Sequence, residues 1–242
     1  MSNHHVGGAR ARARTLLLSW ARPLALALAG LLAGSLAACT GDATGEATAS
    51  VTDPGAAVQL FAGIPQHGDA LGDPAAPLTL TELSDLRCSH CRDFATISLP
   101  VLVDRYVRTG RLRIVFGNLP ILGPDSVEAA RMAVAAGLQN RLFEFTEVFF
   151  ARAGGPVDDA LLRRVASSVP GLDVDAAMNA RDSDTVNQAL VDVRRTAGEF
   201  AISGTPSFLL GRTGEAPTQL RMVRPTNPAT LIGPIETALA GR

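Results

Sequence analysis

Apolar and polar residues alternate along two short stretches of the chain. Residues Leu78–Leu83 form a brief alternating run that ends in a polar corner. Residues Arg111–Asn118 repeat the pattern, with Leu112, Ile114 and Phe116 as the apolar set. A period of two residues is typical of a strand that buries one face, so both stretches are predicted to be β-strands.

A helical pattern separates the two strands. Its apolar stripe consists of Phe94, Ile97, Val101, Leu102 and Tyr106. The helix should end near Arg108, and Pro100 is expected to kink it because proline cannot donate the backbone hydrogen bond. Since a strand, a crossover helix and a second strand follow one another, the two strands are predicted to pair in parallel.

A block of helical pattern follows, at about residues 124–200. Asp125 and Glu128 resemble a capping box, so the first helix is expected to start there and to run to about Ala136. The other predicted helices are Arg141–Arg152, Asp158–Val169, Asp173–Ala180 and Asp184–Phe200.

The pattern returns to strands after this block. Residues Ser207–Leu210 and Gln219–Val223 are predicted to form an antiparallel pair. A last helix is expected to begin at Asn227 and Pro228, as cap and first residue, and to end near Ala240. The order of elements therefore predicts an α/β fold with a helical insertion.

The N-terminus has the pattern of an export signal. A basic region, Ala9–Arg14, precedes the apolar run Pro23–Ala38. Leu36-Ala-Ala-Cys39 resembles a bacterial lipobox, in which the cysteine is acylated and becomes the first mature residue. We therefore expect residues 1–38 to be a signal peptide and 39–55 a lipidated cysteine with a flexible tether. An ordinary cleaved signal peptide and an uncleaved anchor are the alternatives.

Composition and charge narrow the function classes. The 242 residues are 47% hydrophobic, which is enough to bury a sizeable core. Basic residues precede Cys39 and no acidic residue does, so the mature chain is net acidic. Because no basic patch is left in the mature chain, no nucleic-acid partner is expected.

Cysteine usage points to redox chemistry. If Cys39 carries lipid, Cys88 and Cys91 remain as a C-x-x-C pair at a strand-to-helix corner. A helix N-terminus favours an anion, and the thiolate is the nucleophile of disulfide exchange. A structural disulfide closing so short a loop would gain little chain entropy. We therefore expect Cys88 to be the nucleophile and Cys91 the resolving cysteine.

The sequence contains few of the residues that other chemistries would need. A C-x-x-C pair could also be half of a four-ligand zinc site. The mature chain, however, has only His67 and His90 and no third cysteine beyond Cys39. It also lacks a G-x-S-x-G elbow and a phosphate-binding glycine loop. A copper chaperone that uses Cys88, Cys91 and a histidine is the non-enzyme alternative, because thiolates suit Cu(I).

Three motifs together resemble the DsbA-like family of exported thiol-disulfide oxidoreductases. They are Gly72–Pro77 before the first central strand, Asp85–Cys91 at the corner, and Gly204–Phe208 after the helical block. The resemblance covers about residues 56–242. It implies a thioredoxin-like α/β fold with an all-helical insertion at about residues 124–200, and it requires no organic cofactor.

The resemblance also implies roles for particular residues. The Thr205–Pro206 bond is expected to be cis, to face Cys88 and to offer backbone groups to an extended substrate. His90 is expected to stabilise the Cys88 thiolate. Glu82 matches a buried acid that handles protons in the wider thioredoxin-like group, although an exposed strand glutamate is the alternative interpretation.

The predicted function is disulfide donation outside the cytoplasm. The protein should introduce disulfides into exported proteins, anchored to the membrane by lipid, and a membrane partner should re-oxidise its cysteine pair. An isomerase or reductase is the alternative within the enzymes, and it would need a partner that keeps the pair reduced.

Overall fold

The computed structural model describes residues 54–152 and 154–241. The predicted signal peptide, Cys39 and most of the predicted tether lie outside these residues. Helix α1 (Pro54–Leu60) begins slightly before Ala56, the predicted start of the folded domain. Within the described residues, no helix is both long enough and apolar enough to cross a membrane.

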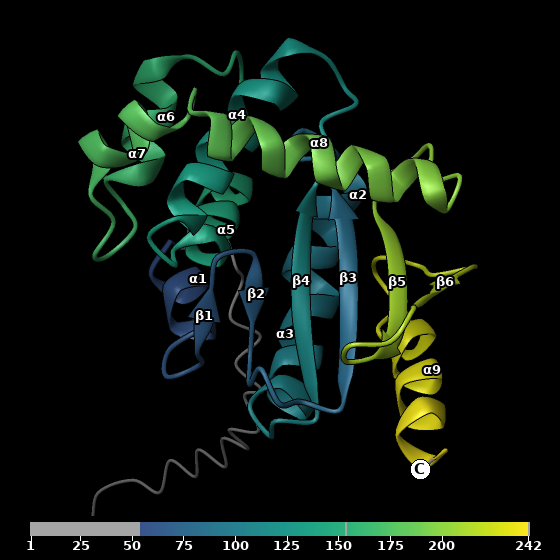
Figure 1. The fold of residues 1–242 in the computed structure, drawn as a ribbon. Helices are drawn as coiled ribbons and strands as arrows, with labels where there is room; N and C mark the ends of the chain where they lie inside the picture. Colours follow the sequence, from purple (N-terminus) through teal and green to yellow (C-terminus); the bar gives the residue numbers. More distant parts are fainter. Residues whose placement is uncertain (1–53, 153, 242) are drawn as a thin grey trace, which may run out of the picture. The chain divides into compact units, whose positions relative to one another are not determined.

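A six-stranded mixed sheet forms the centre of the domain (Figure 1). Strand β3 (Leu78–Ser84) pairs in parallel with β4 (Leu112–Asn118), as predicted, and antiparallel with β5 (Ser207–Arg212). Strand β6 (Thr218–Leu220) pairs antiparallel with β5, also as predicted. The short hairpin of β1 (Gln66–His67) and β2 (Ala70–Leu71) extends the sheet beyond β4 and was not predicted.

The register of β3 and β4 decides which side chains share a face. Leu80 is opposite Ile114, Glu82 is opposite Phe116, and Ser84 is opposite Asn118. Because side chains alternate between the two faces of a strand, these six lie on the same side of the sheet. That side changes from apolar to polar toward the carboxyl ends of both strands.

The helix that follows β3 runs without a break from Ser89 to Val107. It begins as α2 (Ser89–Asp93), widens into the π-helical turn η1 (Phe94–Ser98), and continues through α3 (Leu99–Leu102) and the second π-helical turn η2 (Val103–Val107). Pro100 lies between the two wide turns. The disturbance expected at this proline therefore takes the form of widened turns on either side of it.

Five helices form the insertion between β4 and β5 (Figure 1). They are α4 (Pro124–Gly137), α5 (Leu142–Arg152), α6 (Asp159–Ala166), α7 (Val174–Ala180) and α8 (Asp184–Glu199). Asp158, Asp173 and Ser183 cap three of them by accepting a backbone N–H. The capping box expected at Asp125 and Glu128 is wrong, because α4 begins at Pro124 after a positive-φ Gly123.

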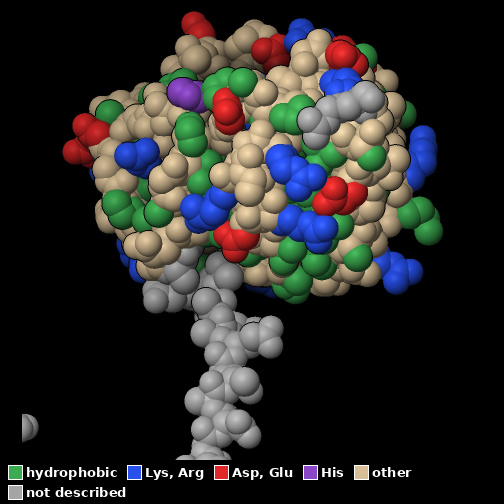
Figure 2. All heavy atoms as spheres, turned by 90° about the horizontal axis from the view of Figure 1, so that it is seen from below, with side chains coloured by type: hydrophobic (Ala, Val, Ile, Leu, Met, Phe, Trp, Pro, Cys, Tyr) green, Lys and Arg blue, Asp and Glu red, His purple; other side chains and the backbone are tan. Residues whose placement is uncertain are grey.

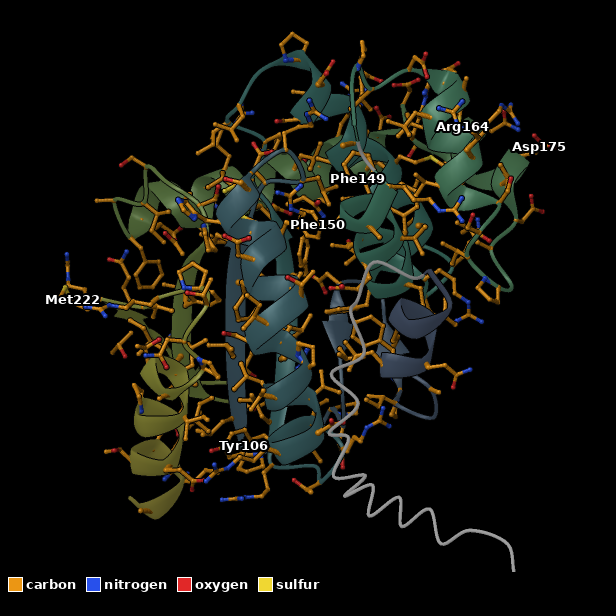
Figure 3. The ribbon with its side chains drawn as sticks, turned by 180° about the vertical axis from the view of Figure 1, so that it is seen from behind. Tyr106, Phe149, Phe150, Arg164, Asp175 and Met222 are labelled. Atoms are coloured by element: carbon orange, nitrogen blue, oxygen red, sulfur yellow. The ribbon has the colours of Figure 1, made fainter. Side chains whose placement is uncertain are left out.

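The C-terminal helix α9 (Ala229–Ala240) is anchored to the lower end of the cysteine helix. The buried Tyr106 hydroxyl donates to Glu236 Oε1 at 2.7 Å, and Arg105 and Arg111 bind the same carboxylate. Figure 3 shows Tyr106 at this end of the helix. Seen from below in Figure 2, basic and acidic side chains are interspersed on this face.

Two main clusters of buried side chains hold the domain together. The first packs the sheet against the cysteine helix and α9, and includes Leu80, Phe94, Ile114, Phe208 and Leu231. The second fills the helical insertion and also contains Cys88 and Cys91. The insertion is therefore continuous with the redox corner.

Candidate redox active site

Cys88 and Cys91 lie at the start of α2 in two different environments. Cys88 is the N-cap residue, with extended backbone (φ −80°, ψ 122°), and Cys91 lies within the first turn. Cys88 is 9% exposed and Cys91 is fully buried. Cys91 is therefore the more deeply buried of the two, and Cys88 is itself largely covered because the insertion packs against it.

The carboxylate of Asp85 holds the corner in place. It is 1% exposed, and its Oδ1 accepts from the backbone N–H of Arg87 and the hydroxyl of Ser126, each at 2.8 Å. Its Oδ2 accepts from the N–H groups of Ile121 and Leu122 at 2.7 and 3.0 Å. Asp85 therefore fixes the turn and also joins the cysteine corner to the first turn of the insertion.

The loop before β5 closes the other side of the site. The Thr205–Pro206 peptide bond is cis, in agreement with the prediction. The carbonyl of Thr205 accepts a hydrogen bond from Cys88 Sγ at 3.3 Å. The expected contact between this loop and the first cysteine is therefore present, and substrate binding by Thr205 and Pro206 stays a prediction.

A small cavity opens beside Cys88. It has a volume of about 190 Å³ and is lined by Leu86, Arg87, Cys88, Ser89, Arg92 and Phe150. Figure 3 shows Phe150 of α5 beside the upper end of the cysteine helix. Because two arginines and an aromatic ring line this cavity, it can accommodate a thiolate together with an apolar neighbour.

Glu82 is buried below Cys91, rather than exposed on the strand. Its side chain is 2% exposed, and burial raises its pKa to about 8, an effect that the neighbouring Ser84 hydroxyl only partly offsets. Burial, together with the charge of Glu82, also raises the pKa of the Cys91 thiol. Cys91 therefore favours its protonated form, and Glu82 is largely protonated at neutral pH and able to supply a proton.

His90 points away from the enclosed part of the site. Its side chain is 73% exposed, and Nδ1 lies 3.6 Å from Asp93 Oδ2, one helical turn further on. The predicted stabilisation of the Cys88 thiolate by this imidazole stays a prediction.

Sequence reasoning missed the contribution of the insertion to the site. Phe150 lines the cavity beside Cys88, and Glu147 of the same helix is a second buried acid. A signal was present, because residues 142–150 are apolar except for Glu144, Thr146 and Glu147. A helix that is apolar on nearly all sides is buried, so its acids are buried with it.

A larger cavity lies elsewhere. Its volume is about 510 Å³, and it lies on the opposite face of the sheet, where Leu83 and Gly117 face Val193 of α8. The cysteines do not line it. Among residues 54–152 and 154–241, no group of three or more His, Cys, Asp or Glu side chains is placed to hold a metal ion.

Comparison with known proteins agrees with this arrangement. A family model described as thioredoxin matches residues 66–219. A Bacillus cereus protein described as a probable disulfide bond formation protein D is 26% identical over 157 residues, covering 62% of this chain and 71% of that protein.

Solved structures share the same fold. A thioredoxin-like oxidoreductase from Silicibacter pomeroyi is 26% identical with a TM-score of 0.59, and the match covers 75% of this chain and 96% of that one. The α-DsbA1 of Wolbachia pipientis is 21% identical with a TM-score of 0.61, covering 72% and 91% of the two chains.

The chain belongs to this thioredoxin family. With a C-x-x-C pair at a helix start, facing a cis-proline, it is a thiol-disulfide oxidoreductase. The predicted fold class, thioredoxin-like with inserted helices, is confirmed.

Asp85→Ala should destabilise the protein by about 3–4 kcal/mol, because it leaves four buried or half-buried donors without their acceptor. Urea unfolding followed by circular dichroism measures this loss. Asp104→Ala removes an exposed acid from a surface ion pair and is the matched control, with an expected change within about 0.5 kcal/mol. Equal losses in both variants would contradict the central place of Asp85.

Glu82→Gln should stabilise the protein increasingly as the pH rises from about 4.5 to about 8. In this window the folded wild type keeps a proton that the unfolded chain releases, so wild-type stability falls as the pH rises. Each pKa unit corresponds to about 1.4 kcal/mol, so the gain at pH 8 should reach a few kcal/mol. Urea unfolding across this range measures it.

Glu199→Gln at the exposed end of α8 is the control for this titration and should leave the pH dependence unchanged. A gain from Glu82→Gln that is the same at every pH would show that Glu82 does not carry the raised pKa.

Proposed function

We propose that this protein introduces disulfides into exported proteins on the extracytoplasmic side of the membrane. The observation that carries the proposal is the unequal environment of the two cysteines. Cys88 borders a cavity and the cis-proline loop, whereas Cys91 is sealed beside a protonated carboxyl. Such a pair can take an incoming sulfur at one position and release the other sulfur into the interior.

The exchange follows from this geometry. A substrate thiolate attacks Cys88 Sγ of the oxidised pair, the Cys88–Cys91 bond breaks, and Cys91 leaves with the electron pair. Glu82 then protonates the buried Cys91 sulfur. A second substrate thiolate attacks the substrate sulfur of the mixed disulfide and releases Cys88 as a thiolate. The substrate dithiol is thereby oxidised to a disulfide, and the cysteine pair of the enzyme is reduced.

The direction depends on which redox state the fold favours. A Cys88 thiolate at the N-terminus of α2 lies at the positive end of the helix dipole. Stabilising the thiolate stabilises the reduced pair, which makes the disulfide a stronger oxidant. This supports an oxidase over a reductase or isomerase.

The cellular setting is part of the same proposal. The lipobox-like Leu36–Cys39 supports acylation of Cys39 and attachment to the membrane, with exported protein thiols as substrates. A membrane protein that accepts electrons from the pair would return it to the disulfide form. The Bacillus cereus relative, described as a probable disulfide bond formation protein D, supports the disulfide-forming role.

The equilibrium redox potential tests the direction. The mature chain should contain no tryptophan, since Trp20 lies in the predicted signal peptide, so alkylated thiols are counted by mass spectrometry after equilibration in glutathione buffers. A potential clearly more oxidising than the roughly −270 mV of thioredoxin is expected. A value as reducing as that of thioredoxin would favour a reductase.

Variants of the two cysteines test their order of action. Cys91→Ala should accumulate mixed disulfides with reduced substrate proteins, because the buried resolving thiol is missing. Cys88→Ala should accumulate few, because Cys91 is fully buried. Non-reducing electrophoresis of each variant with a reduced model substrate measures the trapping, and equal trapping would contradict the assignment.

A further inference from the structure

Helix α5 places a second acid, Glu147, over the polar layer that Glu82, Ser84 and Asn118 form on one face of the sheet. The ring of Phe143 on α5 meets the ring of Phe116 on β4, with centroids 6.3 Å apart. Residues four apart lie on one face of a helix, and residues two apart lie on one face of a strand. Phe150, one more turn along the same face of α5, lines the cavity beside Cys88. Helix α5 therefore runs from Phe116 toward the cysteine corner, and Glu147 lies between the two contacts.

Several buried polar atoms in this layer have no hydrogen-bond partner. Glu82, Ser84, Asn118 and Glu147 are each at most 2% exposed. Glu82 Oε1, Ser84 Oγ, Glu147 Oε2 and both amide atoms of Asn118 have no hydrogen-bond partner among the described residues. Unpaired polar atoms in an interior are costly, so a layer with this many of them is suited to holding and passing protons.

The charge of Glu82 acts on Glu147. Burial raises the pKa of Glu147 well above its usual value, and the negative charge of Glu82 raises it further. From α2, Cys91 faces Glu82. Of the other charged groups nearby, Arg113 of β4 lies on the other face of the sheet, and Glu144 of α5 binds Gln66 of β1. Arg131 of α4 and Arg163 of α6 are paired with Asp182 and Asp175.

We propose that Glu147 is a positioning residue that forms a buried carboxyl pair with Glu82 and keeps it supplied with a proton for Cys91. The proposal rests on the proposed function and adds a residue from the helical insertion to it. When Glu82 protonates the departing Cys91 sulfur, Glu82 becomes a carboxylate. The remaining proton, on Glu147, is then shared between the two carboxyls. Re-oxidation of the cysteines returns the transferred proton to the pair.

The pH profile of disulfide reduction tests this proposal. The oxidised protein is reduced by dithiothreitol between about pH 6 and about pH 9.5, and the rate constant of Glu147→Gln is divided by that of the wild type. The ratio should be near one at low pH and should fall by about tenfold per pH unit above about 8, where Glu82 alone loses its proton. A merely structural effect would give a ratio that does not change with pH.

Two further variants test whether the effect belongs to Glu147 and acts through Glu82. Glu144→Gln, one turn earlier on α5, is the matched control and should give a flat ratio. In a Glu82→Gln background, Glu147→Gln should add no pH dependence, because the residue acts through Glu82. A flat ratio for Glu147→Gln, or an undiminished effect in the Glu82→Gln background, would overturn the proposal.

Infrared spectroscopy tests the pair without any exchange reaction. The band of protonated carboxyls in the wild type should persist above pH 8, and each single variant should remove part of it. An unchanged band in Glu147→Gln would overturn the proposal. If the wild type exchanges with no dithiol, the proposed function and the role of Glu147 are both overturned. If the wild type is active but the rate ratio of Glu147→Gln to wild type does not change with pH, only the role of Glu147 is overturned.

Discussion

The buried carboxylate of Asp85 is the constraint on which the site depends. It ends β3, fixes the turn that leads into Cys88, and binds the loop and the first turn of α4 that follow β4. A charge this deeply buried is tolerated because each oxygen accepts two hydrogen bonds. The sheet, the cysteine helix and the helical insertion are thereby held in one arrangement, and the cysteine corner cannot move without the insertion.

This attachment explains why the two cysteines differ. A bare helix end would leave both sulfurs partly accessible, but here Phe150 and the core of the insertion cover the corner from one side and the Thr205 carbonyl covers it from the other. Access remains at Cys88 through the small cavity, while Cys91 faces Glu82. The packing therefore gives the two sulfurs different surroundings, and the proposed exchange, with attack on Cys88 and protonation of Cys91, follows from this difference.

The elements with strong periodicity were predictable, and so was the pairing of β3 with β4, since a crossover helix leaves little other choice. The β1–β2 hairpin was not, because strands of two residues show no period. The cap of α4 was misjudged because Asp125 and Glu128 match a capping box, whereas Gly123 makes the turn. Cys88 and Cys91 came from a motif of four adjacent residues, and the cis bond before Pro206 came from the resemblance to the DsbA-like family. The apolar pattern of α5 could have indicated that Glu147 is buried. The contacts that Asp85 makes with a distant segment are revealed by no local pattern.

The buried acids of the site are best understood as a compromise between stability and chemistry. Apolar residues of similar size at Glu82 and Glu147 would avoid the desolvation of two carboxyls and would stabilise the fold. They would, however, remove the proposed proton source of the fully buried Cys91 sulfur. A thiolate released into that interior would be a poor leaving group, since burial favours the thiol. The same burial that makes Glu82 costly raises its pKa to about 8, which suits it to the proposed delivery of a proton near neutral pH.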